Sequence, residues 1–130
     1  MKMVVDTSVW INYFNGINSP KTDLLHNALD QYGIIVGDII LLEILQGIRD
    51  DKQFRLTKSL LEATILVQMI NPELAIEYAN HYRILRKKGV TIRKSNDIII
   101  AGYCIKNNVP LLQQDRDFIP YADFFGLELL

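Results

Sequence analysis

The chain has 130 residues, of which 49% are hydrophobic, and its 14 Lys and Arg nearly balance its 15 Asp and Glu. This length fits one domain, residues 1–130, and the longest apolar runs are far too short for a membrane span. A charged residue near the N-terminus interrupts any signal-peptide core, so we expect a cytoplasmic protein. The single cysteine, Cys104, excludes an intramolecular disulfide, and His26 and His81 have no second nitrogen or sulfur ligand at zinc spacing.

Short apolar runs alternate with helical patterns along the chain. This alternation is typical of a mostly parallel sheet that helices cover on both faces, so the sequence predicts an α/β fold, a three-layer α/β/α sandwich with five strands. Asp38 is the expected N-cap of the third helix, and Ser95 or Asn96 that of the sixth. The predicted strands are 3–5, 34–36, 64–69, 109–113 and 127–130, and the predicted helices are 9–14, 22–31, 38–48, 52–62, 72–88, 97–106 and a short turn over 118–125.

Acidic residues fall close to the ends of predicted strands, where α/β proteins bind ligands. Asp6 directly follows the first strand, Asp115 follows the fourth, and Asp97 opens the helix that leads into the fourth. Taken singly, each has an ordinary explanation as a helix cap or a turn residue. Glu43 is harder to explain, because its helix is otherwise covered mostly by apolar side chains. A carboxylate there needs a cation or a hydrogen-bond donor, since burying it alone is costly.

If these four acids converge, only a multiply charged cation makes their mutual repulsion tolerable. The set contains no His or Cys, and an all-oxygen donor set favours a hard ion. The sequence therefore predicts Mg²⁺ or Mn²⁺ rather than Zn²⁺.

Four blocks of the sequence resemble the conserved blocks of PIN-domain, VapC-type ribonucleases, the toxins of VapBC toxin–antitoxin pairs. The blocks are VVDTSVWI at 4–11, LEILQG at 42–47, NDIIIA at 96–101 and LLQQDRDF at 111–118, and their order and spacing match over essentially the whole chain. The family usually places Thr where this sequence has Gln113. The resemblance implies a metal site of Asp6, Glu43, Asp97 and Asp115, with Ser8 and Asp117 as supporting polar residues.

The activity implied by the resemblance is metal-assisted hydrolysis of RNA phosphodiester bonds. Asp6, Asp97 and Asp115 are expected as direct or water-bridged ligands, and Glu43 as a further ligand or as the acceptor of the water's proton. The sequence does not choose between one ion and two. The resemblance also implies a homodimer, and an antitoxin of the VapB kind that binds near the first helix.

Positive charge must hold RNA near an acidic pocket. Between Tyr78 and Asn96 there is no acidic residue, so this stretch is the first candidate and Arg116 the second; a solvated helix end is the alternative explanation for the stretch. The expected RNA-binding residues are Arg83, Arg86, Lys87, Lys88, Arg93, Lys94 and Arg116.

Four other functions are compatible with a small α/β domain that carries acidic residues. A phospho-acceptor receiver domain needs paired acids after the first strand, and a haloacid-dehalogenase-type phosphatase needs a second Asp where Ser8 stands. A catalytically idle PIN-like module that binds RNA or protein is the strongest rival from another class. Within the nuclease reading, an RNA-processing enzyme remains the alternative to a toxin.

Overall fold

The computed structural model describes all 130 residues. Its centre is a parallel sheet of four strands in the order β3-β2-β1-β4, which confirms the α/β class. The strands are β1 (Lys2–Val5), β2 (Gly33–Gly37), β3 (Ile65–Val67) and β4 (Leu111–Leu112).

The fifth predicted strand, 127–130, was wrong. The end of the chain does lie beside β4, where Leu111 N donates to Glu128 O and Leu130 N donates to Leu111 O, both at 2.9 Å. The pairing is a single bridge between Leu111 and Leu129. β4 itself has only two residues, in part because Pro110 before it has no N–H for a ladder.

Seven α-helices and one 3-10 turn surround the strands. None of the helices has both the length and the apolar character needed to cross a bilayer. The helices are α1 (Thr7–Phe14), α2 (Pro20–Gln31), α3 (Asp38–Gln46), α4 (Asp51–Glu62), α5 (Pro72–Lys87), α6 (Ser95–Asn107) and α7 (Ile119–Phe125), with η1 at Arg116–Phe118.

Two predicted helix caps were wrong. Gly37 rather than Asp38 is the N-cap of α3, and Asp38 Oδ1 instead accepts from the backbone N–H groups of Ile39 and Met69, at 2.9 and 3.0 Å. Lys94 rather than Ser95 or Asn96 is the N-cap of α6, without a side-chain cap. The helix begins at Ser95, two residues earlier than the predicted range of 97–106, and Asp97 lies within its first turn.

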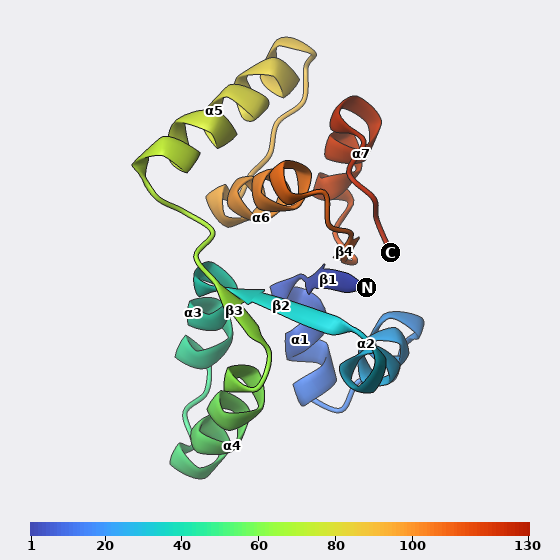
Figure 1. The fold of residues 1–130 in the computed structure, drawn as a ribbon, viewed down its shortest axis with the longest axis vertical. Coiled ribbons are helices and arrows are strands. Elements are labelled where there is room, and N and C mark those ends of the chain that lie inside the picture. The colour runs from blue at the N-terminus through green and yellow to red at the C-terminus, as the bar shows by residue number, and fades with distance from the viewer.

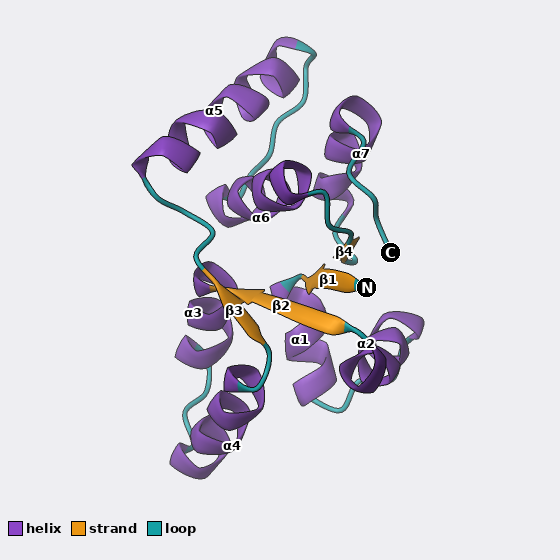
Figure 2. Ribbon diagram, viewed as in Figure 1, coloured by secondary structure: helices purple, strands orange, loops and turns teal.

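The strand order explains the layers. The chain moves from β1 to β2 to β3 in one direction and then returns past β1 to β4, so right-handed crossovers place the helices before β3 and those after it on opposite faces. Figure 1 shows α1 to α4 on one side of the strands and α5 to α7 on the other, and the strands lie between these two groups in Figure 2.

The core fills the space between sheet and helices. Met3, Val4 and Val5 of β1 are almost fully buried, as is Trp10 of α1. Cys104 is buried and free, as expected for a small apolar side chain. Gly102 lets α6 lie against α5, because a Cβ at this position would collide with the ring of Tyr78. This close packing fixes the helix that carries Asp97.

Candidate metal centre

The acidic residues meet where the strand order reverses, between β1 and β4. Asp6 follows β1, and its backbone N–H donates to Leu112 O of β4 at 2.9 Å, which ties the carboxyl ends of the two strands together. Asp115 comes three residues after Leu112, and α6 brings Asp97 to the same edge of the sheet. The site therefore forms at the position that the topology favours for ligands.

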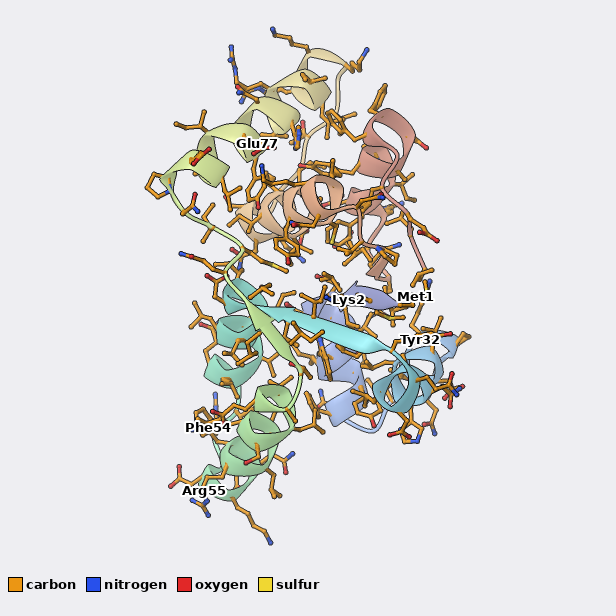
Figure 3. All side chains as sticks on the ribbon, in the orientation of Figure 1. Met1, Lys2, Tyr32, Phe54, Arg55 and Glu77 are labelled. Carbon is orange, nitrogen blue, oxygen red and sulfur yellow. The ribbon has the colours of Figure 1, made fainter.

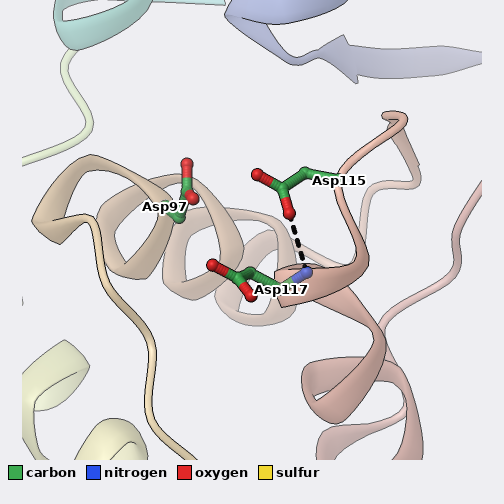
Figure 4. A group of neighbouring side chains, drawn as sticks. All are labelled: Asp97, Asp115 and Asp117. Carbon is green, nitrogen blue, oxygen red and sulfur yellow. Dashed lines mark hydrogen bonds between the residues drawn. The ribbon is translucent and has the colours of Figure 1, made fainter.

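Three carboxylates share one small space. One oxygen from each of Asp97, Asp115 and Asp117 lies within 4.8 Å of the others. Figure 4 shows Asp97 on its helix facing the two aspartates of the η1 segment. Asp115 Oδ1 also accepts from Asp117 N at 2.9 Å, which fixes the turn between them. Asp117, predicted only as a supporting residue, stands in the same group as two of the predicted ligands.

The donor set fits a hard divalent cation. Asp97 is only 6% exposed, and the Oδ2 atoms of Asp97 and Asp117 are buried without a hydrogen-bond partner. Leaving buried carboxylate oxygens unpaired is costly, so a cation placed among them would remove an unfavourable term. All three donors are carboxylate oxygens, the ligands that Mg²⁺ and Mn²⁺ prefer.

The electrostatics of the site point the same way. Burial, and after it the negative charge of Asp6, raises the pKa of Asp97 to about 7, against a smaller lowering by Lys94. Burial also raises the pKa of Asp6, while hydrogen bonds from Ser8 and from the backbone oppose that rise and the charge of Glu43 adds to it. A cation among these carboxylates would stabilise their ionised forms.

Asp6 and Glu43 differ from the other three acids because each accepts a hydrogen bond from a side-chain hydroxyl group. Ser8 Oγ donates to Asp6 Oδ2 at 2.7 Å, and Thr7 Oγ1 donates to Glu43 Oε1 at 2.8 Å. Glu43 is half-buried, and neither acid belongs to the group within 4.8 Å. The four predicted acids thus form a chain of interacting charges, with Glu43 at its margin.

Thr7 was missed by the sequence analysis. It is the first residue of α1, it is buried, and its hydroxyl holds Glu43 from 36 positions away in the chain. The available signal was its position directly after Asp6, where a polar residue opens a helix of otherwise apolar character. Gln113 is also buried, and its Oε1 has no hydrogen-bond partner.

The predicted basic stretch divides into two parts. Arg93 and Lys94 lie at the acidic cluster, with Arg93 Nε 3.7 Å from Asp117 Oδ2 and Lys94 Nζ 3.7 Å from Asp115 Oδ2. Arg116 lines an open hollow of about 500 Å³ together with Ser8, Gln114 and Asp115. The other four residues are exposed at the end of α5, where Arg86 lies over the ring of Tyr82 and Lys88 over that of Phe124; they are Arg83, Arg86, Lys87 and Lys88.

The PIN domain family model matches residues 3–123. The chain belongs to the PIN-domain family. Among its relatives, ribonuclease VapC1 of Methanocaldococcus jannaschii is 30% identical, over 98% of this chain and 86% of the relative. Ribonuclease VapC11 of Mycobacterium tuberculosis is 29% identical, over 97% and 96%.

Solved structures of toxin–antitoxin complexes have the same PIN fold. The structure of VapBC2 from Rickettsia felis bound to a promoter DNA fragment matches with a TM-score of 0.78 and 19% identity, over all of this chain and 98% of that one. VapBC-1 from nontypeable Haemophilus influenzae matches with a TM-score of 0.77 and 19% identity, over 100% and 97%. At these identities the likeness supports the fold.

Proposed function

We propose that this PIN-domain protein is an endoribonuclease toxin of the VapC type, and that it hydrolyses RNA with a Mg²⁺ or Mn²⁺ ion at the acidic cluster. The observation that carries the proposal is the group of Asp97, Asp115 and Asp117, in which two buried carboxylate oxygens have no hydrogen-bond partner. The VapC ribonucleases among its relatives support the reaction class.

The proposed roles follow from the geometry. Asp97, Asp115 and Asp117 hold the ion, and Asp6 lies close enough to add its charge. A bound dication supplies a polarised water and neutralises charge that develops on the phosphorus. The hydrogen bond from Ser8 opposes the rise in the pKa of Asp6, and Thr7 fixes the orientation of Glu43 at the margin of the site. Glu43, whose other oxygen is left free, is then available as a proton acceptor.

The RNA backbone is held by the cations around the cluster. Arg93, Lys94 and Arg116 lie next to the carboxylates, and their charges offset the repulsion between an acidic pocket and phosphate. Arg83 and Lys87 are exposed at the end of α5 and form a second, separate basic group.

The test is cleavage of single-stranded RNA by the purified protein in Mg²⁺, Mn²⁺ or EDTA. We expect cleavage that needs the ion and leaves 5′-phosphate and 3′-hydroxyl ends, since water is the nucleophile. Asp97→Asn should abolish it, whereas Asp123→Asn, which changes an exposed aspartate on α7, should not. Cleavage that persists in EDTA, or cyclic phosphate ends, would contradict the mechanism; a wild-type chain that binds RNA but never cuts it would support an idle module.

The proposed partners are an antitoxin of the VapB kind and a second copy of the chain. A groove between α1 and α3 is lined by Ile11, Phe14, Asn15, Glu43, Ile44, Gly47 and Ile48, so a segment bound there would touch the margin of the acidic site. Large apolar side chains are exposed elsewhere, among them Ile76 at 67% and Leu42 at 60%. Growth arrest relieved by a co-expressed product of an adjacent small reading frame would establish the toxin role, and light scattering would establish the dimer.

A further inference from the structure

Two basic side chains reach the acidic cluster from the same short segment. Arg93 and Lys94 directly precede α6, and Lys94 is its N-cap, with its carbonyl oxygen accepting from Asp97 N at 3.1 Å. The backbone that carries these cations is therefore fixed to the turn that carries Asp97. Their charged groups lie 3.7 Å from oxygens of Asp117 and Asp115.

These ion pairs are loose. A separation of 3.7 Å is beyond hydrogen-bond distance, and Asp117 Oδ2 accordingly has no hydrogen-bond partner. The Arg93 and Lys94 side chains are 74% and 65% exposed, whereas those of their carboxylate partners are only 15% and 24% exposed. Ion pairs at this separation, made by long and exposed side chains, are weak, so a dication can replace them.

We propose that Arg93 and Lys94 are internal counter-ions of the cluster, which pair with Asp117 and Asp115 while the site holds no dication and bind an RNA phosphate once a dication takes these carboxylates. This inference rests on the proposed function, and it adds a coupling between metal binding and substrate binding. Its basis is the pairing of each of two neighbouring cations with a different carboxylate of one cluster.

The balance of charge supports the exchange. Three carboxylates face two cations, and the buried Oδ2 of Asp97 has no hydrogen-bond partner, so the cluster stays under-neutralised with both ion pairs in place. A dication among the three carboxylates neutralises them at least as well and leaves both side chains free. The open hollow lined by Ser8, Gln114, Asp115 and Arg116 offers room for a phosphate, and its Asp115 is the carboxylate that pairs with Lys94.

Exchange of this kind makes two ligands cooperate. Each ion pair must be broken before the ion binds, which lowers metal affinity, and each freed cation then strengthens RNA binding. By linkage, the ion raises RNA affinity by the same factor by which RNA raises affinity for the ion. Removing either cation should therefore tighten metal binding and weaken RNA binding.

The first measurement is Mn²⁺ binding to the full chain without RNA, by calorimetry. We expect Arg93→Gln and Lys94→Gln each to bind Mn²⁺ about two- to fivefold more tightly than the wild type. Arg116→Gln removes a charge next to Asp115 that makes no ion pair. It therefore tests whether loss of any nearby positive charge is enough to tighten Mn²⁺ binding. Arg55→Gln removes a charge at the far end of α4, on the other side of the sheet (Figure 3), and should change nothing. Equal tightening in Arg116→Gln, or none in the two paired variants, would overturn the inference.

The second measurement is binding of a short fluorescent RNA, by anisotropy, in EDTA and in Ca²⁺, with the RNA checked on a gel afterwards. Ca²⁺ should raise RNA affinity of the wild type more than that of Arg93→Gln or Lys94→Gln. An equal rise in all three proteins would contradict the role of the freed cations. These failures differ from failure of the proposed function, in which the wild type itself neither binds Mn²⁺ nor cleaves RNA.

Discussion

The two halves of the acidic edge are stabilised in different ways. In the half next to α1, each carboxylate accepts a short hydrogen bond from a hydroxyl, Asp6 from Ser8 and Glu43 from Thr7. In the half between α6 and η1, Asp97 and Asp117 each keep a buried oxygen without a hydrogen-bond partner, and the cations that pair with this half are exposed. The chain supplies hydroxyl donors to the first half, whereas a cation would stabilise the unpaired oxygens of the second.

This difference separates positioning from binding. Hydroxyl donors fix an ionised carboxylate in one orientation, and an ion that competes for the same oxygen must share it with them. Carboxylates that lack donors gain most from an ion, because the ion removes both the unpaired oxygens and the mutual repulsion. We therefore assign ion binding mainly to the α6–η1 half and orientation of the reacting water and proton mainly to the α1 half.

Among the changes that compare the two halves, the largest effect is expected at Asp117, which the sequence analysis placed outside the metal set. We predict that Asp117→Asn lowers the rate of RNA cleavage by at least about 100-fold, because it removes one of the three clustered carboxylates. Initial rates in excess Mn²⁺ measure the loss, with Asp123→Asn on α7 as the matched control. A variant that keeps more than a tenth of the wild-type rate would return Asp117 to a supporting role.

A smaller loss is expected in the other half. Ser8→Ala removes the hydrogen bond that lowers the pKa of Asp6, so that pKa should rise further and the acid limb of the pH–rate profile should move to higher pH. We predict about a tenfold loss of rate near neutral pH, with Mn²⁺ affinity changed little. Ser59→Ala, at an exposed position on α4, is the control. A loss of Mn²⁺ affinity as large as that in Asp117→Asn would abolish the distinction between the halves.

The sequence predicted the α/β class because that class depends on local patterns, and apolar runs identified β1 and β2. Of the four acids predicted to share an ion, Asp97 and Asp115 lie in the cluster, whereas Asp6 and Glu43 lie outside it. The prediction of a fifth strand was wrong because the sequence pattern at the chain end is the same whether the segment pairs with β4 over four residues or makes a single bridge.

Other features depend on tertiary packing, which no local pattern encodes. Asp117 joins the cluster because η1 turns back toward α6, and Thr7 reaches Glu43 only because α1 lies beside α3. The sequence analysis treated the basic stretch as one RNA-binding set. In the structure its residues separate where α5 ends and the loop to α6 turns toward the carboxylates. The division between a site-facing pair and a solvated helix end therefore required the structure.

The third prediction concerns stability without metal. Asp97 has an ordinary pKa of 3.8 when unfolded and about 7 in the fold, so the folded state binds this proton more tightly and loses stability as pH rises from about 4 to about 7. In EDTA, Asp97→Asn should remove this loss and raise the melting temperature at pH 8 by about 5 °C. Melting curves from pH 5 to pH 8 measure it. A pH dependence in Asp97→Asn identical to that of the wild type would show that the ionised carboxylate is already well stabilised.

The smallest effect is expected at the basic residues far from the carboxylates. Lys87 is exposed at the end of α5 and pairs with no acidic group, whereas Lys94 lies at the cluster. If RNA is held mainly at the cluster, Lys87→Gln should weaken RNA binding about twofold or less and lower the slope of log affinity against log salt by no more than about 0.7, the value for one phosphate contact on a single strand. Anisotropy titrations at several salt concentrations give both numbers. A loss larger than that in Lys94→Gln would place the main RNA contact on α5, and the cations beside the carboxylates would then serve the ion rather than the substrate.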